Sequence, residues 1–322
     1  MTRVYVTGGN GFLGSSVVSG LAAATGTELV VSGDVRDPAR AVPGVVYERA
    51  DITRREDLVG QFRTHRIDTV VHLAAIMNPG PHITREQEYL VDVEGTRNVL
   101  EACFATGVKR IVVSSSGAAY GYHADNPAWI TESDALRGNP EFAYSDHKRI
   151  VEGVLAEART EHPELEQVIF RIGTILGATV DNQITALFER RRVLAIAGSD
   201  SPFVFIWDED VVACMVRAAT DGPAGIYNLA GDGAVTVHEL AAVLGKKLLT
   251  LPAWLLTAAL AVAKPLRLTR YGPEQVGFLR YRPVLSNARL KDEFGYTPSR
   301  TSRRALEAWK AARVARLAAE AS

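Results

Sequence analysis

This 322-residue sequence has few cysteines and no excess of charge of either sign. The two cysteines, Cys103 and Cys214, are far apart and lie in apolar surroundings, so they provide no disulfide framework and are typical of small buried side chains in a reducing compartment. The 36 basic and 37 acidic residues are well mixed and give a formal net charge of -1. This balance predicts no binding of nucleic acid or of anionic lipid through a broad basic surface.

Signal-like and membrane-spanning segments are also missing. The sequence begins directly with a strand-like run at residues 3–6, without the charged region and long apolar run of a secretory signal. One uncharged apolar stretch, residues 248–263, has 16 residues and contains Pro252, whereas a spanning helix needs about 20. We therefore expect a cytoplasmic protein with no integral span, in which this stretch is core, lines a pocket or touches a membrane surface.

Metal-ligand spacing is absent as well. The seven histidines form no cluster with carboxylates or cysteines, so the sequence gives no support for metal catalysis. His72, His123 and His147 are interpreted as structural or surface residues. The chain has no internal repeat, and the charges of an Ala/Arg-rich helix at 303–319 are expected to face solvent.

Short β-branched runs alternate with helical patterns through the first half of the chain. The runs cover residues 3–7, 29–32, 69–73, 110–114 and 168–172. Helical spacing fills residues 12–24, 53–65, 85–106 and 141–161. Such alternation is typical of βαβ units, in which crossover helices join parallel strands. The sequence therefore predicts an α/β fold with a doubly wound parallel sheet.

A glycine-rich turn lies between the first predicted strand and the first helix. Gly8, Gly11 and Gly14 have the spacing G-x-x-G-x-x-G. Glycines allow close approaches that a Cβ would block, so a pyrophosphate can lie against the N–H groups and positive dipole end of the helix. This context is typical of a Rossmann-type dinucleotide site, where Phe12 and Leu13 would also border the cofactor.

The nature of the dinucleotide depends on the end of the second strand. Asp34 lies 20 positions beyond Gly14, where an acidic side chain binds ribose hydroxyls and repels a 2'-phosphate, which favours NAD. Arg36 keeps NADP open, because a guanidinium could bind that phosphate. Two further strand ends are expected at the adenine and ribose cleft. They contribute Asp51, Ile52, Leu73, Ala74 and Ala75.

Tyr144 and Lys148 form a candidate proton-transfer pair, because four-residue spacing in a helix brings both side chains onto one face. A tyrosine pKa of about 10 is too high for a base at neutral pH, and a lysine charge together with an oxidised nicotinamide would lower it. Tyr144 would then act as a general acid or base. Ser116 follows a buried strand at the expected carboxyl edge of the sheet, where its hydroxyl can orient a substrate oxygen.

These motifs in this order resemble the extended short-chain dehydrogenase/reductase family, which includes NAD-dependent epimerases and dehydratases. The resemblance covers nearly the whole chain. It rests on the glycine turn at 7–14, His-Leu-Ala-Ala at 72–75, the segment 93–100, the serine run at 114–116, Y-x-x-x-K at 144–148 and Trp-Asp-Glu-Asp-Val at 207–211. The resemblance implies that Ser116 polarises the substrate oxygen, Tyr144 exchanges its proton, and Lys148 holds the nicotinamide ribose and tunes Tyr144. It also implies a homodimer paired through the helices at 85–106 and 144–161.

The strand and helix rhythm becomes irregular after residue 173, which predicts a smaller C-terminal substrate lobe. We expect residues 1–172 to form the dinucleotide-binding domain, with segments near 203–229 returning to it. The substrate lobe is then expected to comprise residues 173–202 and 230–322.

Several positions depart from the best-known branches of that family. Asp92 stands where many members have asparagine, and Gly117 with Ala118 replaces the Asp-Glu pair of dehydratases, which disfavours dehydration. Thr174 and Phe203 stand near positions where nucleotide-sugar epimerases have asparagine and arginine. Losing a polar partner and a charge should cost a diphosphate roughly 1 to 3 kcal/mol each.

These departures rank three functional hypotheses. The leading one is NAD(P)-dependent hydride transfer at a secondary alcohol or ketone of a small, less charged substrate, with a lipophilic substrate left open. An alternative is an NAD-dependent nucleotide-sugar epimerase, which oxidises and re-reduces its substrate. A third is a non-catalytic dinucleotide-binding or redox-sensing protein, against which the complete set of Ser116, Tyr144 and Lys148 argues.

Overall fold

A seven-stranded parallel sheet organises the computed structural model, which describes all residues except 78, 81, 267–268, 270–271, 274 and 321–322. Its strands are β1 (Thr2–Thr7), β2 (Thr27–Asp34), β3 (Val45–Arg49), β4 (Thr69–His72), β5 (Arg110–Ser116), β6 (Glu166–Ile172) and β10 (Gly225–Leu229). They lie in the order β10-β6-β5-β4-β1-β2-β3. Because β1 pairs in parallel with both β2 and β4, the order reverses beside β1, and the doubly wound prediction is confirmed.

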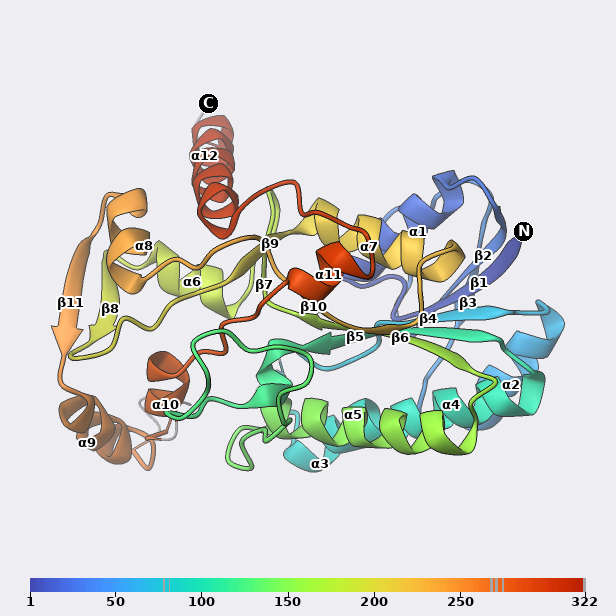
Figure 1. Cartoon of the computed structure of the whole chain (residues 1–322), viewed down its shortest axis with the longest axis horizontal. Coiled ribbons are helices and arrows are strands. Elements are labelled where there is room, and N and C mark those ends of the chain that lie inside the picture. Colours follow the sequence, from blue (N-terminus) through green and yellow to red (C-terminus); the bar gives the residue numbers. More distant parts are fainter. Residues whose placement is uncertain (78, 81, 267–268, 270–271, 274, 321–322) are drawn as a thin grey trace.

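Helices cover both faces of this sheet (Figure 1). One face carries α2 (Arg55–Thr64), α4 (Gly95–Thr106) and α5 (Ala143–Glu161), and the other carries α1 (Phe12–Ala23), α7 (Asp208–Thr220) and α11 (Ala288–Asp292). A separate apolar core fills the space on each side of the sheet. Cys103 and Cys214 are buried as free thiols, one in each core, as predicted.

The helix predicted over 85–106 is divided. It consists of α3 (Arg85–Tyr89), a π-helical turn (Leu90–Glu94) and α4. Asp92 lies in the π turn, where its carboxylate accepts the backbone N–H of Ile76 at 2.8 Å and its carbonyl accepts the Thr96 hydroxyl at 2.6 Å. The extra residue of a π turn often marks a functional site, and here it places a carboxylate against the end of β4.

A smaller lobe forms the other end of the molecule (Figure 1). Its strands are β7 (Thr174–Leu176), β8 (Arg192–Ile196), β9 (Phe205–Trp207) and β11 (Lys247–Leu251). Its helices are α6 (Gln183–Glu189), α8 (Val237–Leu244), α9 (Ala253–Ala263), α10 (Gln275–Arg280) and α12 (Ser302–Glu320). Packed aromatic rings, including Phe188, Phe205 and Trp309, form its core. The division into a cofactor domain and a substrate lobe stays a prediction.

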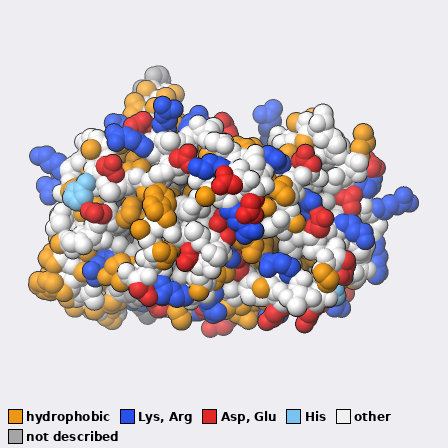
Figure 2. Space-filling view, in the orientation of Figure 1, with side chains coloured by type: hydrophobic (Ala, Val, Ile, Leu, Met, Phe, Trp, Pro, Cys, Tyr) orange, Lys and Arg blue, Asp and Glu red, His pale blue; other side chains and the backbone are white. Residues whose placement is uncertain are grey.

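The apolar stretch 248–263 forms two elements separated by Pro252, namely most of β11 and all of α9. Core packing was one expectation for this stretch, and it is wrong for α9, because none of the eleven described residues of that helix is buried. No described helix is long and apolar enough to cross a membrane. On the face shown in Figure 2, acidic and basic side chains are interspersed, as the balanced composition predicts.

Candidate active site

The glycine turn between β1 and α1 is shaped by close backbone approaches. Gly8 has a φ of +67°, and a Cβ on it would lie 2.8 Å from the backbone N and Cα of Ala74. A Cβ on Gly14 would collide with the carbonyl oxygen of Gly8. Glycine is therefore required at both positions. The result is a bare backbone cradle facing the end of β4.

The first turn of α1 completes this cradle. Its N-cap residue, Gly11, supplies no side-chain cap, and the turn contains no acidic residue. The first N–H groups of a helix lack intrahelical partners and form the positive end of its dipole. The segment containing Phe12 and Leu13 therefore fits an anionic group such as a dinucleotide pyrophosphate.

Asp34 and Arg36 lie together beside the turn. The buried Asp34 carboxylate accepts the Asn10 N–H at 3.1 Å and the Arg36 N–H at 3.0 Å. The Arg36 guanidinium pairs with the same carboxylate at 3.3 Å and reaches within 3.3 Å of the position that a Cβ on Gly11 would take. The carboxylate thus ends β2 next to the cradle, as expected, with an exposed arginine beside it.

The other predicted cofactor residues gather at the same edge of the sheet. Leu73 donates its N–H to the Thr7 carbonyl at 3.1 Å, and Ala74 packs on Gly8. Ala75 follows and lines a small cavity beside Lys148. Asp51 and Ile52 are connected to the end of β2 through Ala50, which donates its N–H to the Asp34 carbonyl at 3.0 Å. Asp51 accepts the N–H and hydroxyl of Thr53, and Ile52 packs against Gly95.

Ser116, Tyr144 and Lys148 also converge. Ser116 ends β5, and the first turns of α5 carry the other two side chains to the same place. The Lys148 ammonium lies 5.9 Å from the centroid of the Tyr144 ring and donates to the Ser114 carbonyl at 2.9 Å. Ser116 is close enough to the Tyr144 phenol to lower its pKa. The three groups therefore form one polar cluster at the carboxyl edge of the sheet.

Burial governs the ionisation of both Tyr144 and Lys148. Burial raises the pKa of Tyr144 to about 12, and the charge of Asp92 adds to this rise, whereas the nearby Ser116 opposes it. Burial also lowers the pKa of Lys148, against the nearby charges of Asp92 and Glu152. Within the protein's own residues, desolvation of the phenolate is the largest influence on this pKa. The lowering of the Tyr144 pKa by Lys148 together with an oxidised nicotinamide stays a prediction.

Arg282 is a functional candidate that local sequence reasoning missed. Its guanidinium lies 3.8 Å from the centroid of the Phe203 ring and donates to the Ser201 carbonyl at 3.0 Å. Among the described residues it has no carboxylate partner, and its Nε is buried without a hydrogen bond. Phe203 stands near the position where the sequence comparison with nucleotide-sugar epimerases expected an arginine. The fold brings the Arg282 cation to Phe203 from a distant segment of the chain.

An aromatic cluster connects Arg282 with Tyr144. The Arg282 guanidinium lies 5.8 Å from the Phe278 ring centroid, and Phe278 packs on Tyr122 and Phe142 with centroids 4.7 and 5.8 Å apart. Phe142 in turn lies 6.2 Å from Tyr144. These rings and the arginine belong to three segments that meet only in the folded chain, so no local motif could reveal them.

A match to a protein-family model establishes the family of the chain. The model described as the NAD dependent epimerase/dehydratase family matches residues 4–230. This protein belongs to that family. It is consequently a member of an enzyme family of the extended short-chain dehydrogenase/reductase type, as the sequence motifs predicted.

Individual relatives of this epimerase/dehydratase family member are distant. The UDP-glucose 4-epimerase of Halalkalibacterium halodurans is 29% identical over 267 residues, covering 74% of this chain and 78% of the relative. The structure of UDP-glucose 4-epimerase from Thermotoga maritima with UDP-glucose has a TM-score of 0.76 at 20% identity, covering 98% and 99% of the two chains. The Bordetella bronchiseptica enzyme WbmG, in complex with NAD and UDP, has a TM-score of 0.74 at 17% identity, covering 98% and 94%. These two structural matches show the fold.

A buried carboxylate, that of Asp92, lies close to Lys148 in this family member. Asp92 lies 3.4 Å from the Nδ1 atom of His147, and both side chains are almost fully buried. A cavity of about 10 Å³, which is room for roughly one water molecule, lies between Asp92, Thr96, His72 and Lys148. The Asp92 charge therefore acts on both Tyr144 and Lys148.

Replacing Asp92 by asparagine should move the pH dependence of catalysis. Asp92 raises the pKa of Tyr144, so removing its charge should lower that pKa and shift to lower pH the rising limb of any kcat/KM profile that requires the Tyr144 phenolate. Asp146→Asn is the matched control, because that carboxylate pairs with Arg85 and Arg149. An Asp92→Asn profile that coincides with the wild-type profile would show that the carboxylate carries no charge felt by Tyr144.

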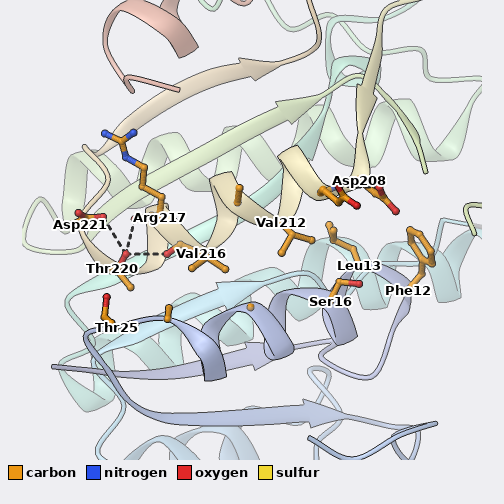
Figure 3. Close-up of a pocket in the computed structure, with 14 residues that line it drawn as sticks. Phe12, Leu13, Ser16, Thr25, Asp208, Val212, Val216, Arg217, Thr220 and Asp221 are labelled. Atoms are coloured by element: carbon orange, nitrogen blue, oxygen red, sulfur yellow. Dashed lines mark hydrogen bonds between the residues drawn. The ribbon is translucent and has the colours of Figure 1, made fainter. Parts of the chain in front are cut away.

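A groove of larger volume than the cavity beside Asp92 lies elsewhere. It has a volume of about 650 Å³ and runs between α1 and α7, with Phe12 and Asp208 toward one end and Thr25 and Asp221 at the other (Figure 3). Its lining excludes Ser116, Tyr144 and Lys148. Size alone therefore gives a poor guide to the chemistry of this protein.

The described residues contain no group suited to a metal ion, and His72 has a structural role. No group of three or more His, Cys, Asp or Glu side chains in that part of the chain is placed to hold a metal ion. His72 lies between the hydroxyls of Thr7 and Thr96, at 2.7 and 3.0 Å. Burial and the Lys148 charge lower its pKa to about 3, so it is a neutral structural link between β1, β4 and α4.

Proposed function

We propose that the protein is an NAD-dependent epimerase of a nucleoside-diphosphate sugar. The observation that carries this proposal is Arg282, a cation without a carboxylate partner among the described residues, at the far side of the aromatic cluster that borders Tyr144. An anionic substrate group would satisfy it. The loss of a cation at Phe203 had favoured a less charged substrate, and Arg282 removes that objection. The relatives named UDP-glucose 4-epimerase support the same reading.

The bare cradle and its neighbours would hold the cofactor. The N–H groups around Gly8, Gly11, Phe12, Leu13 and Gly14 would bind the pyrophosphate. Asp34 would bind the adenosine ribose, with Arg36 beside it, and the carboxylate favours NAD over NADP. The remaining predicted residues would border the adenine and the nicotinamide ribose. They are Asp51, Ile52, Leu73, Ala74, Ala75, Tyr144 and Lys148.

The reaction would use the polar cluster as a proton-transfer set. Bound NAD supplies the hydride acceptor for the first half-reaction and the donor for the second. Ser116 would hold the substrate oxygen, while the Tyr144 phenolate takes the hydroxyl proton as the C–H hydride leaves the same carbon. Lys148, charged and close, would stabilise the phenolate, and Tyr144 would return the proton after the ketone presents its other face.

Incubation with UDP-glucose and related nucleotide sugars tests the proposal directly. The purified protein with NAD should convert a substrate into its C4 epimer without net accumulation of NADH, as followed by nuclear magnetic resonance and absorbance. Stoichiometric NADH from an apolar secondary alcohol, with no binding of any nucleoside diphosphate, would overturn it.

Net oxidation of a lipophilic secondary alcohol is the second candidate function. The observation in its favour is the aromatic cluster of Tyr122, Phe142 and Phe278 next to Tyr144, together with Thr174 in place of an amide. These aromatic side chains would pack favourably against an apolar ring system of the substrate. The assay above separates the two functions, because only the dehydrogenase consumes NAD.

Arg282→Met should weaken nucleotide binding. Loss of a charge-assisted contact costs roughly 1.5 to 3 kcal/mol, so Kd for UDP should rise about 10- to 100-fold while NAD affinity is kept, as measured by titration calorimetry. Arg300→Met is the matched control, since its guanidinium also lies over an aromatic ring of the lobe, 4.5 Å from the Trp207 centroid. Equal UDP affinity in the Arg282→Met and wild-type proteins would remove the diphosphate assignment.

A further inference from the structure

Ser201 has a backbone conformation that serine rarely adopts. Among the described residues, Ser201 and Arg66 are the only non-glycine residues with a positive φ, of +39° and +48°. Arg66 is exposed and follows the last turn of α2, where a left-handed residue is common. Ser201 is 4% exposed and lies in the loop between β8 and β9, which follows a strand instead of a helix. Strain of this kind persists only where the surrounding structure holds it, often at functional sites.

Both oxygens of Ser201 contact Arg282. The Nη1 atom of the Arg282 guanidinium donates to the Ser201 carbonyl at 3.0 Å and also to the Ser201 hydroxyl. That hydroxyl in turn donates to the carbonyl of Leu279, near the end of α10. A serine hydroxyl can accept and donate at the same time. One buried residue therefore ties the guanidinium to the helix that precedes it in the chain.

Two more contacts come from the loop that contains Ser201. The Phe203 backbone exchanges two hydrogen bonds with Val235, each of 2.8 Å, which fixes the ring on which the guanidinium lies. Ser199 donates its hydroxyl to the Arg280 carbonyl at 2.9 Å, across 81 positions of sequence. The loop is thus built to hold the segment that carries the cation.

These contacts use only part of the Arg282 guanidinium. An arginine side chain has five N–H donors in a fixed fork. Both bonds to Ser201 come from Nη1, and Nε is buried without a hydrogen bond. Holding a flexible side chain in place before the ligand arrives lowers the entropic cost of binding. The cation is therefore oriented in advance, with donors left for an anion.

We infer that Ser201 is a positioning residue, which holds the Arg282 guanidinium in the orientation that binds the diphosphate of the substrate. This inference rests on the proposed function and deepens it. Glycine would adopt the same φ without strain but would lack the hydroxyl. The strained backbone is thus explained by the contact that the side chain makes, and Ser201 acts through Arg282.

Ser201→Gly separates the role of the hydroxyl from that of the backbone. The variant relieves the positive φ and removes the side-chain contact with Arg282. Kd for UDP should therefore rise about three- to tenfold, which is the range of one hydrogen bond, while NAD affinity is kept. In turnover of a nucleotide sugar, KM should rise by the same factor and kcat should hardly change. Titration calorimetry and steady-state kinetics measure these effects.

Three further variants complete the experiment. Ser201→Ala lacks the hydroxyl but keeps a Cβ at a positive φ, so it should match Ser201→Gly in UDP affinity and melt at a lower temperature. Ser199→Ala is the matched control, because it removes a hydroxyl of the same loop that reaches only the Arg280 carbonyl, and its Kd for UDP should equal that of the wild type. In the Arg282→Met background, Ser201→Gly should cause no further change in Kd, because the two residues act as a unit.

The outcomes distinguish this inference from the proposed function. Wild-type Kd for UDP in Ser201→Gly, alongside a weakened Arg282→Met, would overturn the positioning role alone. A loss that Ser201→Gly adds in full to that of Arg282→Met would do the same, because Ser201 would then act independently of the cation. Unchanged UDP affinity in Arg282→Met would instead remove the diphosphate site, and the positioning role with it.

Discussion

Tyr144→Phe is expected to reduce kcat by about 10²- to 10⁴-fold, the usual contribution of a general acid or base, while leaving NAD affinity and melting temperature near the wild-type values. The variant removes one hydroxyl, whose pKa Ser116 influences, and it keeps the ring that packs near Phe142. The loss should therefore appear in turnover and hardly in binding. Steady-state kinetics on a verified substrate, with NAD binding measured by fluorescence, separates the two effects.

Tyr122→Phe is the matched control for that experiment. Tyr122 belongs to the same aromatic cluster, and burial likewise raises the pKa of its phenol, with the negative charge of a Tyr144 phenolate adding to the rise. Its phenol has no proposed role in proton transfer, so turnover should stay within a fewfold of wild type. Wild-type rates in Tyr144→Phe, or equal losses in both variants, would rule out Tyr144 as the acid and base.

Local motifs predicted the part of the site that lies on single elements. The glycine turn, Asp34 and the Tyr144/Lys148 pair are each recognisable within a few residues because a strand end or a helical turn fixes their geometry. Their mutual proximity then followed from the parallel sheet, whose strands present their carboxyl ends at one edge. The structure places these groups together at that edge. Their roles toward NAD stay predictions.

Arg282 and α9 show what local patterns cannot reveal. Arg282 reaches Phe203 across 79 positions of sequence, and nothing in its neighbourhood distinguishes it from the other 35 basic residues. Core burial was one of three expectations for the stretch that contains α9, because whether an apolar helix is covered depends on the rest of the tertiary structure. The π turn at Asp92 has a similar origin, because one inserted residue leaves helical composition unchanged while it rotates a carboxylate toward the site.

A second large effect is expected at a buried ion pair next to the site. The side chains of Arg171 and Glu152 are only 5% and 2% exposed, and their closest atoms are 2.6 Å apart. Burial by itself lowers the pKa of Arg171, but the hydrogen bond and charge of Glu152 outweigh it and raise that pKa overall. Arg171 also donates to the Tyr120 phenol at 2.8 Å and to the Glu132 carbonyl at 3.0 Å. The pair thus joins β6, α5 and the loop around Tyr120.

Glu152→Met should lower the free energy of unfolding by about 3 to 5 kcal/mol, because it leaves the Arg171 charge buried without a counterion. Chemical denaturation followed by circular dichroism measures this loss. The double variant Glu152→Met/Arg171→Met is the informative control, since replacing both members of a buried pair by apolar side chains is often close to neutral. We expect it to recover most of the stability that the single variant loses. A double variant as unstable as Glu152→Met would instead mean that the hydrogen bonds from Arg171 to Tyr120 and Glu132, and not its unpaired charge, account for the effect.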